Sequence, residues 1–478
     1  MIKSQQKNIR YCSTRGEAPS VGFLDVALTG LAPDGGLYVP EAWPVLNQNS
    51  IEQFAGLPYH EVAARVISLF AGDAIEFPEL SRMTEKAYAT FRHPAVVSLN
   101  QAGPNRFVLE LFHGPTLAFK DLAMQLLAII MDHELRKRRQ LTTVVVATSG
   151  DTGGAAVEAF RGCSQVDLFV LFPKGRVSEV QRWMMTTAAS RNVHALAIEG
   201  TFDDCQALVK AMFNNQAFRD RVRLSGVNSI NFVRIVAQVV YYFVAAVALG
   251  APHRKVAFTV PTGNFGNVFS GYVAARMGLP IERLVIATNA NDILVRTLET
   301  GEYHPRDVVP TSSPSMDIQV SSNFERLMFD AYGRDPGPIR AAMAELGHSR
   351  SFTLSEKALK EIVSIFSADR ATADEISAAI RTTQQKSDYV IDPHTAVGMA
   401  VADKLEIDPR VPMIVLSTAH PAKFPDAVED ACGFRPLLPS WLAALESKGE
   451  SFDTLPSNQS DVQHYIQGRS RAASEKAA

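Results

Sequence analysis

The sequence is poor in cysteine. Only four cysteines occur in 478 residues, and none stands at CxxC spacing from another: Cys12, Cys163, Cys205 and Cys432. Zinc sites and disulfide frameworks both need closely spaced or paired cysteines, so neither is expected here. The sequence therefore predicts no metal site and a reduced, cytoplasmic compartment.

The chain also has little net charge. Its formal net charge is −3, whereas proteins that bind nucleic acid or anionic membranes usually present a basic surface. We therefore expect neither as a main partner. The first residues, 1–7, turn polar at once and lack the apolar core of a signal peptide. A small-molecule enzyme remains as the default class.

A run long enough to span a membrane is missing as well. The stretch that most invites this interpretation is 235–249, whose fifteen residues are apolar apart from Gln238. Fifteen residues make about 22 Å of helix, whereas a spanning helix needs about 20 residues. We expect a buried core helix at this place.

The chain does have the composition of a globular protein. Its residues are 46% hydrophobic and 20% charged, which matches the average of globular domains. A length of 478 residues predicts two or three domains. No repeat at a solenoid or propeller period is visible.

Beyond about residue 95, short β-branched runs end in polar, glycine-rich loops and give way to helical patterns. The expected strands are 144–147, 168–172, 195–198, 256–260, 284–287 and 413–416, and helices are expected at 155–160 and 268–277. Alternating strands and helices indicate parallel sheets built from βαβ units. Ligands bind to such sheets where loops leave the carboxyl ends of strands.

The two ends of the chain differ from this pattern. The first 95 residues mix short helices and loops, and they include the turn-rich segment 30–40. The final 33 residues, from about Glu446, are polar and rich in Ser, Gln and Lys. Most of that stretch is predicted to be a loosely held tail.

The first candidate for chemistry is Lys120, in the segment His113–Asp121. It stands at the start of a run that predicts an amphipathic helix: Leu122, Leu126, Leu127, Ile130 and Met131. A helix N-terminus and apolar neighbours both lower the pKa of a lysine. Schiff-base chemistry needs such a lysine, because only the neutral amine attacks an aldehyde. Taken alone, the segment favours an ordinary surface lysine at a helix end.

Two loops are candidates for anion binding. The first, Gly263–Asn267, lies between a strand and a helix, where backbone N–H groups and the helix dipole favour an anion. It matches neither dinucleotide nor P-loop fingerprints. The second, Ser149–Gly154, has hydroxyls at a helix start and could bind a substrate carboxylate or phosphate. A tight turn and ordinary N-capping are the alternatives.

Arg234 is a further candidate, because it ends the polar segment 225–234 and leads the apolar helix. Its planar fork suits phosphate or carboxylate. An ion pair with an Asp or Glu inside the protein is the alternative.

The segment 416–424 follows a strand, and the hydroxyl of Thr418 could bond to a buried heteroatom of a cofactor. Considered in isolation, Thr418 and His420 favour satisfied backbone contacts. For His394, at an expected helix N-terminus, a structural role is expected.

In combination these segments resemble threonine synthases. The resemblance runs from about Arg10 to Leu438. It includes two N-terminal segments, 13–16 and 30–40, that other pyridoxal-phosphate enzymes of the same fold type lack. The lysine segment, the SGDTG loop, the GNFGN loop and the stretch 417–424 all follow in the order of the family. The similarity is to its E. coli- and yeast-like branch.

The resemblance implies a fold type II pyridoxal-phosphate (PLP) enzyme, similar to the tryptophan synthase β subunit. Such an enzyme has two α/β domains with parallel-rich sheets and an N-terminal segment. The implied division is an N-terminal segment at 1–95, a large PLP-binding domain at 96–119 and 216–440, a small domain at 120–215, and a polar tail at 446–478.

The resemblance also implies roles for individual residues. Lys120 corresponds to the lysine that binds the cofactor aldehyde, and Thr418 to the hydroxyl that faces the pyridine nitrogen. The cofactor phosphate loop corresponds to Gly263, Asn264, Phe265, Gly266 and Asn267. The residues that fall where related enzymes bind the substrate carboxylate and phosphate are Ser149, Thr152, Asn228, Ser229 and Arg234.

The implied function is that of a lyase. It turns O-phospho-L-homoserine and water into L-threonine and phosphate by β,γ-elimination and hydration, the last step of threonine biosynthesis. The expected state is a monomer or a homodimer. The alternatives are another fold type II enzyme, such as a serine/threonine dehydratase, and a catalytically silent paralogue that binds a phosphorylated metabolite.

One position departs from the wider fold type. Many fold type II enzymes carry an asparagine beside the 3′ oxygen of the cofactor, and Asp151 occupies the matching place here. The resemblance to the E. coli- and yeast-like branch accounts for the aspartate but leaves the partner of that oxygen open.

Overall fold

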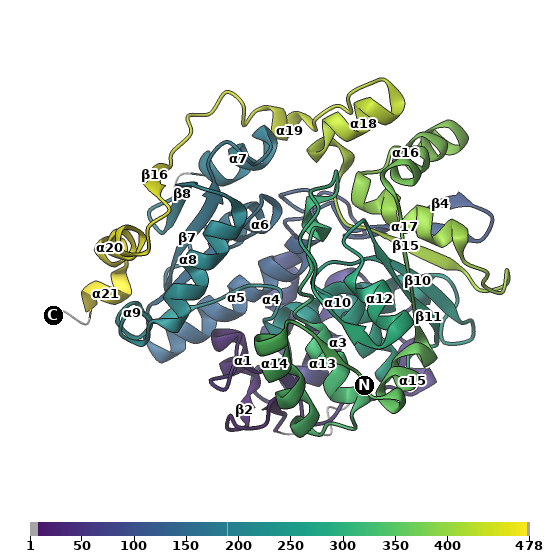
Figure 1. Cartoon of the computed structure of the whole chain (residues 1–478), viewed down its shortest axis with the longest axis horizontal. Helices are drawn as coiled ribbons and strands as arrows, with labels where there is room; N and C mark the ends of the chain where they lie inside the picture. Colours follow the sequence, from purple (N-terminus) through teal and green to yellow (C-terminus); the bar gives the residue numbers. More distant parts are fainter. Residues whose placement is uncertain (1–7, 189, 476–478) are drawn as a thin grey trace.

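The computed structural model describes residues 8–188 and 190–475. Two β-sheets stand side by side, and the long helices α5 (Lys120–Arg138) and α10 (Phe232–Ala248) run between them (Figure 1). This is the two-sheet α/β architecture that the alternation of strands and helices predicts. Apolar side chains of both helices belong to the largest of its hydrophobic clusters, and further clusters line the other faces of the two sheets.

The larger sheet has six strands in the order β14-β11-β10-β15-β5-β4. All neighbours pair in parallel except β4 and β5, which pair antiparallel. The strands are β4 (Ser98–Gly103), β5 (Arg106–Glu110), β10 (Val256–Pro261), β11 (Ile281–Thr288), β14 (Phe366–Arg370) and β15 (Met413–Ser417). Its helices are α11 (Gly266–Arg276), α12 (Ile293–Thr300), α13 (Phe324–Ala331), α14 (Pro336–Ser349), α15 (Glu356–Ile365), α16 (Ala373–Ser387), α17 (Pro393–Lys404) and α18 (Pro425–Cys432), with single turns at η1 (Pro314–Met316) and η2 (Pro421–Lys423) and a small hairpin of β12 (Glu302–Tyr303) and β13 (Phe352–Thr353).

The smaller sheet has five strands in the order β16-β8-β7-β6-β9, all parallel. The strands are β6 (Thr142–Ala147), β7 (Val166–Pro173), β8 (Val193–Glu199), β9 (Leu224–Ser225) and β16 (Asp453–Pro456). The helices around it are α6 (Asp151–Phe160), α7 (Glu179–Thr186), α8 (Phe202–Asn214), α9 (Gln216–Val222), α19 (Ser440–Ala443), α20 (Gln459–Arg469) and α21 (Arg471–Glu475).

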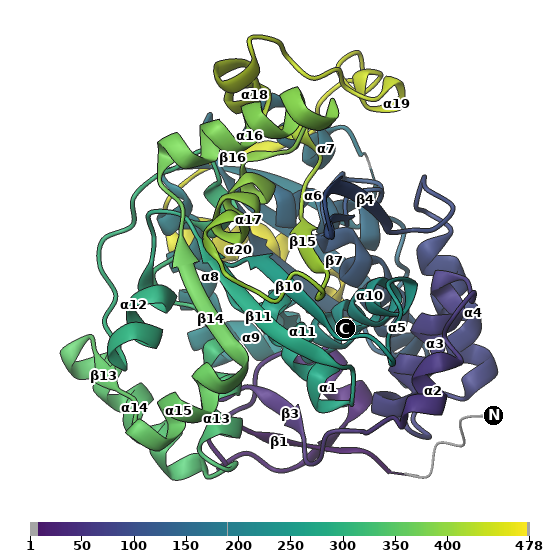
Figure 2. The ribbon, with the colours of Figure 1, turned by 90° about the vertical axis from the view of Figure 1, so that its right-hand side faces the viewer.

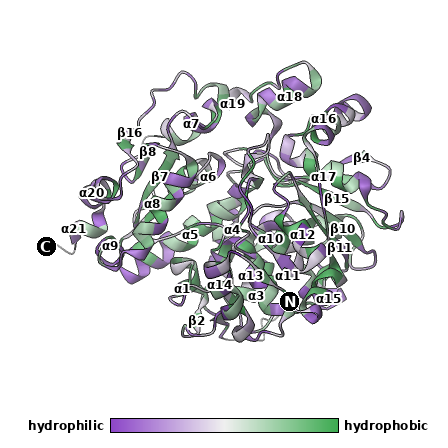
Figure 3. Cartoon of the chain, viewed as in Figure 1, coloured by the Kyte–Doolittle hydropathy of each residue, from purple (hydrophilic) through white to green (hydrophobic). Residues whose placement is uncertain are grey.

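Every strand that the β-branched runs predict is present, and the strands and core-facing helices carry the hydrophobic residues (Figure 3). The apolar run 235–249 forms most of α10, which packs against α3, α5 and α11 with nearly all its residues buried. The prediction of a core helix is confirmed.

None of the helices among residues 8–188 and 190–475 has the length and apolar character that crossing a membrane requires.

The N-terminal part contains more regular structure than its loops suggest. A three-stranded antiparallel sheet lies below the larger domain in Figure 2, next to four helices. Its elements are β1 (Arg10–Ser13), β2 (Val21–Gly22), β3 (Tyr38–Pro40), α1 (Phe23–Thr29), α2 (Gln48–Glu52), α3 (Tyr59–Ala71) and α4 (Phe77–Tyr88).

The prediction of a loosely held C-terminal tail is wrong for 453–475. Strand β16 extends the smaller sheet beside β8, and the apolar side chains of Val462 and Ile466 are fully buried against it. Arg471 donates to the Asp167 carboxylate at 2.7 Å and to the Ser164 carbonyl at 2.9 Å. A polar segment can therefore dock because a few apolar residues on one helix face meet an existing apolar surface.

One predicted boundary also changes. Helix α9 and strand β9 follow residue 216, but β9 pairs with β6 in the smaller sheet. The stretch 216–225 therefore belongs with the smaller sheet. After β9 the chain returns to the larger sheet through α10 and β10. The rest of the division into domains stays a prediction.

Candidate active site

Lys120 is the first residue of α5, as the apolar periodicity predicts. Its Nζ lies 3.4 Å from Asp151 Oδ2 and 3.4 Å from the Ser315 hydroxyl. The side chain is only 12% exposed. Burial lowers the pKa of Lys120, nearby Lys423 and Arg234 lower it further, and Asp151 opposes them. The surface-lysine alternative is excluded, and the amine is biased toward its reactive neutral form.

The backbone brings Thr418 next to this lysine. The segment before α5 runs antiparallel to the end of β15, with a bridge between Ala118 and Ala419. The Phe119 N–H donates to the Thr418 carbonyl at 2.9 Å. Thr418 is buried and directly follows β15 of the larger sheet. It contacts Phe119, the residue that precedes Lys120.

The Gly263–Asn267 loop joins β10 to α11. Phe265 caps the helix at a positive φ of 65°, and Gly266 is the first helical residue. The loop packs so tightly that a Cβ on Gly263 would lie 2.9 Å from the Ser315 carbonyl oxygen. The buried Nδ2 of Asn267 has no hydrogen-bond partner among the described residues. An unpartnered donor at a helix N-terminus is the arrangement that an anion completes.

The Ser149–Gly154 loop joins β6 to α6 in the smaller sheet. Gly150 has a φ of 136°, and a Cβ there would lie 2.3 Å from the Gln181 side chain. The loop therefore needs glycine at this point. Ser149 and Thr152 remain partly exposed, on the same turn as Asp151, which approaches Lys120.

Arg234 lies in the first turn of α10 and is 3% exposed. One nitrogen donates to the Val227 carbonyl at 3.0 Å, while Nε has no partner among the described residues. No carboxylate within the described ranges forms an ion pair with it, so the internal ion-pair alternative fails there. Burial lowers the pKa of Arg234 to about 10, so it stays cationic at neutral pH and lacks an anion. Asn228 and Ser229 lie just before it and are partly exposed.

A polar segment that the sequence analysis missed ties these loops together. Asn323 donates to the Asn264 carbonyl at 2.9 Å and to the Ser229 carbonyl at 3.3 Å. Ser321 donates to the Gly263 carbonyl at 2.5 Å. The segment 311–323 has no regular hydrophobic period, so only its richness in serine could have marked it.

Two more neighbours escaped the sequence analysis. Lys423, within the stretch 417–424, pairs with Asp151 at 2.5 Å. Gln181, on α7, donates to the same carboxylate at 3.0 Å. Although burial opposes it, the two lysines hold the pKa of Asp151 well below its usual range.

The contacts of His394 agree with the structural role that the sequence predicts for it. Its Nδ1 lies 2.6 Å from the Asp392 carboxylate, and its Nε2 accepts from the Ser315 N–H at 3.3 Å. It supports the turn that carries Ser315, which in turn lies next to Lys120. His420 caps the turn η2 by accepting from the Ala422 N–H. Burial lowers its pKa to about 4.

The residues fit a phosphorylated aldehyde such as PLP. The buried amine of Lys120 can hold the aldehyde carbon, and the N-terminus of α11 with the unpartnered Asn267 amide can hold the phosphate. Arg234 supplies a second unpartnered donor for another anion. The arrangement therefore offers one reactive amine and two buried donors that can bind anions.

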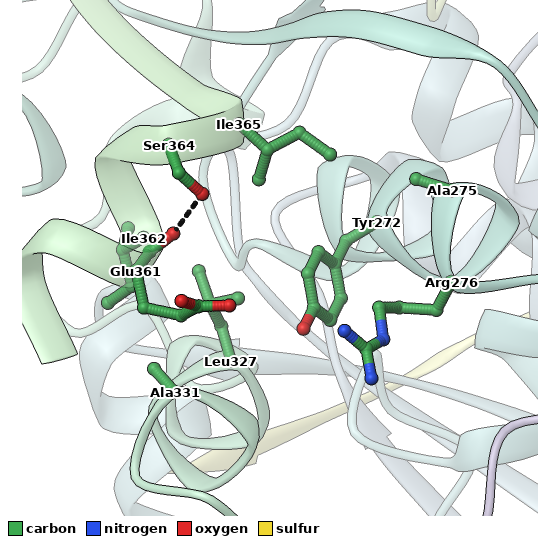
Figure 4. A pocket seen from close by; sticks show the side chains of 9 residues that line it. All are labelled: Tyr272, Ala275, Arg276, Leu327, Ala331, Glu361, Ile362, Ser364 and Ile365. Carbon is green, nitrogen blue, oxygen red and sulfur yellow. Dashed lines mark hydrogen bonds between the residues drawn. The ribbon is translucent and has the colours of Figure 1, made fainter.

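A cavity of about 170 Å³ lies elsewhere, between α11, α13 and α15 (Figure 4). Tyr272 and Arg276 point toward it from one side and Glu361 from the other (Figure 4). It contains none of the predicted site residues, so it is separate from the site around Lys120.

Three family descriptions match the chain: "Threonine synthase N terminus" over residues 10–88, "Pyridoxal-phosphate dependent enzyme" over 96–348, and "Threonine synthase, C-terminal" over 395–466. The chain is 48% identical over 459 residues to a threonine synthase of Pseudomonas aeruginosa, covering 96% of this chain and 98% of that protein.

Solved structures agree with these matches. A PLP-bound threonine synthase from Brucella melitensis is 57% identical, with a TM-score of 0.94 over 97% of this chain and all of that one. The threonine synthase from yeast is 36% identical, with a TM-score of 0.92 over 97% of this chain and 99% of that one. The fold type II architecture is confirmed.

Proposed function

The chain belongs to the threonine synthase family of PLP-dependent enzymes, and from this premise we propose how its residues divide the work of the reaction. The reaction converts O-phospho-L-homoserine and water into L-threonine and phosphate. In net terms the Cγ–O bond to phosphate becomes a C–H bond, and a hydroxyl replaces a hydrogen on Cβ.

Lys120 is the proposed attachment point of the cofactor. Bound PLP supplies an electron sink for carbanion chemistry at the substrate carbons. The loop of Gly263, Asn264, Phe265, Gly266 and Asn267 is proposed to hold its phosphate. The fixed helix N-terminus and the unpartnered Asn267 amide support this assignment. Thr418, buried beside the start of α5, is proposed to face the pyridine nitrogen.

Arg234 is proposed to bind an anionic group of the substrate. Its guanidinium is buried, has an unpartnered Nε and lies close enough to Lys120 to lower the pKa of that lysine. Ser149, Thr152, Asn228 and Ser229 are proposed to complete the sites for the substrate carboxylate and phosphate. Their partial exposure and their position next to Asp151 and Arg234 support this role.

Lys120 Nζ is also the proposed base. With substrate bound, the uncharged amine of Lys120 would accept the proton that leaves Cα. Proton loss from Cβ then allows phosphate to leave from Cγ. Arg234 and the neighbouring hydroxyls keep the leaving phosphate next to the substrate, where its oxygens can carry protons before water adds at Cβ.

Closure of the two sheets over the substrate is a further part of the proposal. Ser149 and Thr152 come from the smaller sheet, whereas the cofactor loop and Thr418 come from the larger one. A small approach of the two would assemble the site and exclude water until the hydration step.

The observation that carries the proposal is the buried amine of Lys120, whose pKa burial and the nearby Arg234 lower, together with two buried unpartnered donors, Arg234 Nε and Asn267 Nδ2. The test is phosphate release from O-phospho-L-homoserine, with keto-acid formation from threonine as the dehydratase assay. We expect fast phosphate release, a yellow protein, and cofactor fixed on Lys120 by borohydride. A Lys120→Ala variant that still makes threonine would refute the assignment, and phosphate release at background rate would indicate a silent paralogue.

A small-molecule substrate is the partner that the family implies. We propose that neither nucleic acid nor a membrane is a partner, and that the protein acts in the cytoplasm as a monomer or homodimer. Support comes from the small net charge and from the four cysteines, all of which are free.

A further inference from the structure

The carboxylate of Asp151 lies between two lysines. Lys423 Nζ is 2.5 Å from Asp151 Oδ1, and Lys120 Nζ is 3.4 Å from Oδ2. The Lys423 and Asp151 side chains are 1% and 4% exposed. The proposed reaction uses Lys120 but leaves the second lysine without a task.

Lys423 is held in a fixed position. Besides its ion pair, its ammonium donates to the Thr116 carbonyl at 2.9 Å. Thr116 in turn donates to the Asp121 carboxylate through its hydroxyl at 2.6 Å and its backbone N–H at 2.7 Å. Asp121 is the residue after Lys120, so Lys423 is linked to the start of α5 through Thr116 and to the neighbour of Lys120 Nζ through Asp151. A buried ammonium is costly unless it is paired and hydrogen-bonded in this way.

The charged and polar groups around Lys120, Lys423 and Asp151 come from several helices and turns. Lys120 faces Asp151 of α6, Lys423 of η2, Arg234 of α10 and the neutral hydroxyl of Ser315. Lys423 also acts on Asp121 of α5 and on His420, and Asp151 accepts from Gln181 of α7. Among these groups Asp151 is the one anion within hydrogen-bond distance of Lys120.

We propose that Lys423 is a positioning residue for Lys120: it holds the Asp151 carboxylate in place and shields Lys120 from it, so that the Asp151–Lys423 pair sets the pH at which the Lys120 amine is free to react. The inference rests on the proposed function only in taking Lys120 as the reactive amine.

The two partners must then act on Lys120 in opposite directions. Without Lys423, the carboxylate has Lys120 as its nearest cation and stabilises the protonated amine. Without the carboxylate, Lys120 faces only cations and loses its proton more easily. A role confined to folding would give no such opposition.

The experiment follows the capture of PLP by the apoenzyme across pH 6 to 10, with visible absorbance as the readout. We expect the midpoint of the capture rate to move to higher pH in Lys423→Gln and to lower pH in Asp151→Asn, by about one unit or tenfold in rate at fixed pH. The midpoint of Lys423→Arg, which keeps the charge, should lie closer to that of the original protein than the midpoint of Lys423→Gln does. Lys174→Gln, which changes an exposed lysine next to the smaller sheet, is the control, and its midpoint should not shift.

The outcomes separate the inference from the proposed function. Shifts in the same direction, or unchanged midpoints in both single variants, overturn the inference. An original apoenzyme that does not capture PLP on Lys120 overturns the proposed function instead. Should a single variant fold poorly by circular dichroism, the double variant Asp151→Asn/Lys423→Gln removes both charges. Its midpoint should return close to the original one, and a displaced midpoint contradicts the proposal.

Discussion

Tyr241 donates a hydrogen bond of 2.6 Å from its hydroxyl to the side-chain oxygen of Asn267. Tyr242, the next residue on α10, donates to the same oxygen at 3.0 Å and to the Asn267 carbonyl at 2.9 Å. These bonds fix the amide so that its nitrogen faces away from the tyrosines, where it has no partner among the described residues. The core helix therefore orients a donor of the proposed phosphate loop.

Changing Asn267 to Ala should weaken PLP binding by about 10- to 100-fold, since a hydrogen bond to a charged group contributes about 1.5–3 kcal/mol. Tyr241→Phe should weaken it less, because the amide stays but is held by one tyrosine. Titration of the apoenzyme with PLP measures both. Tyr465→Phe, which removes a surface hydroxyl bonded to Asp453, is the control. Equal affinities in all four proteins would exclude Asn267 from the cofactor site.

Arg234→Met should lower kcat/KM for O-phospho-L-homoserine by about 100-fold or more, because a buried charge-assisted contact to an anion is lost. Arg234→Lys should recover only part of the loss, since lysine lacks the planar fork. Steady-state phosphate release checks both, with the exposed Arg410→Met as control. Unchanged kinetics in Arg234→Met would mean that the substrate anions bind elsewhere.

Glu110 should give a pH-dependent contribution to stability. Although burial opposes it, hydrogen bonds from His113, Ser98 and Tyr389 lower its pKa from 4.5 to about 2. Because the folded pKa lies below the unfolded one, the contribution is complete above pH 4.5 and is lost as the pH falls toward 2.

Glu110→Gln should therefore cost about 2–3 kcal/mol of unfolding free energy at pH 7, less than the full shift implies because solvent screens the partly exposed carboxylate. Its difference from the original protein should shrink below pH 4.5. Urea unfolding at several pH values measures this, with the exposed Glu345→Gln as reference. A difference that stays constant down to pH 3 would show that ionisation of Glu110 is not the cause.

The docked C-terminal segment should contribute to the stability of the smaller sheet. Ile466 is fully buried on α20, so Ile466→Ala should cost about 2–4 kcal/mol. Leu437 is 90% exposed, and Leu437→Ala should cost little. Thermal unfolding of both variants decides the point. A segment that merely trails from the fold would make the two substitutions equivalent.

The sequence by itself determined the elements whose signal is local. The β-branched runs that become β6, β7, β8, β10, β11 and β15 are recognisable because a buried parallel strand needs continuous apolar residues. The start of α5 at Lys120 and the buried α10 follow from helical periodicity in the same way. The order of the motifs further indicated the family, which the comparisons confirm.

Only the tertiary structure decided which distant groups meet. Lys423 and Asp151 are far apart in the sequence, and nothing local marks them as a pair. The polar C-terminal segment docks through Val462 and Ile466, two apolar residues one helical turn apart, onto a surface formed by other elements. Burial and pairing depend on what the rest of the chain places opposite a residue. Local periodicity therefore predicts strands and helices, whereas the charges around Lys120 are set by packing.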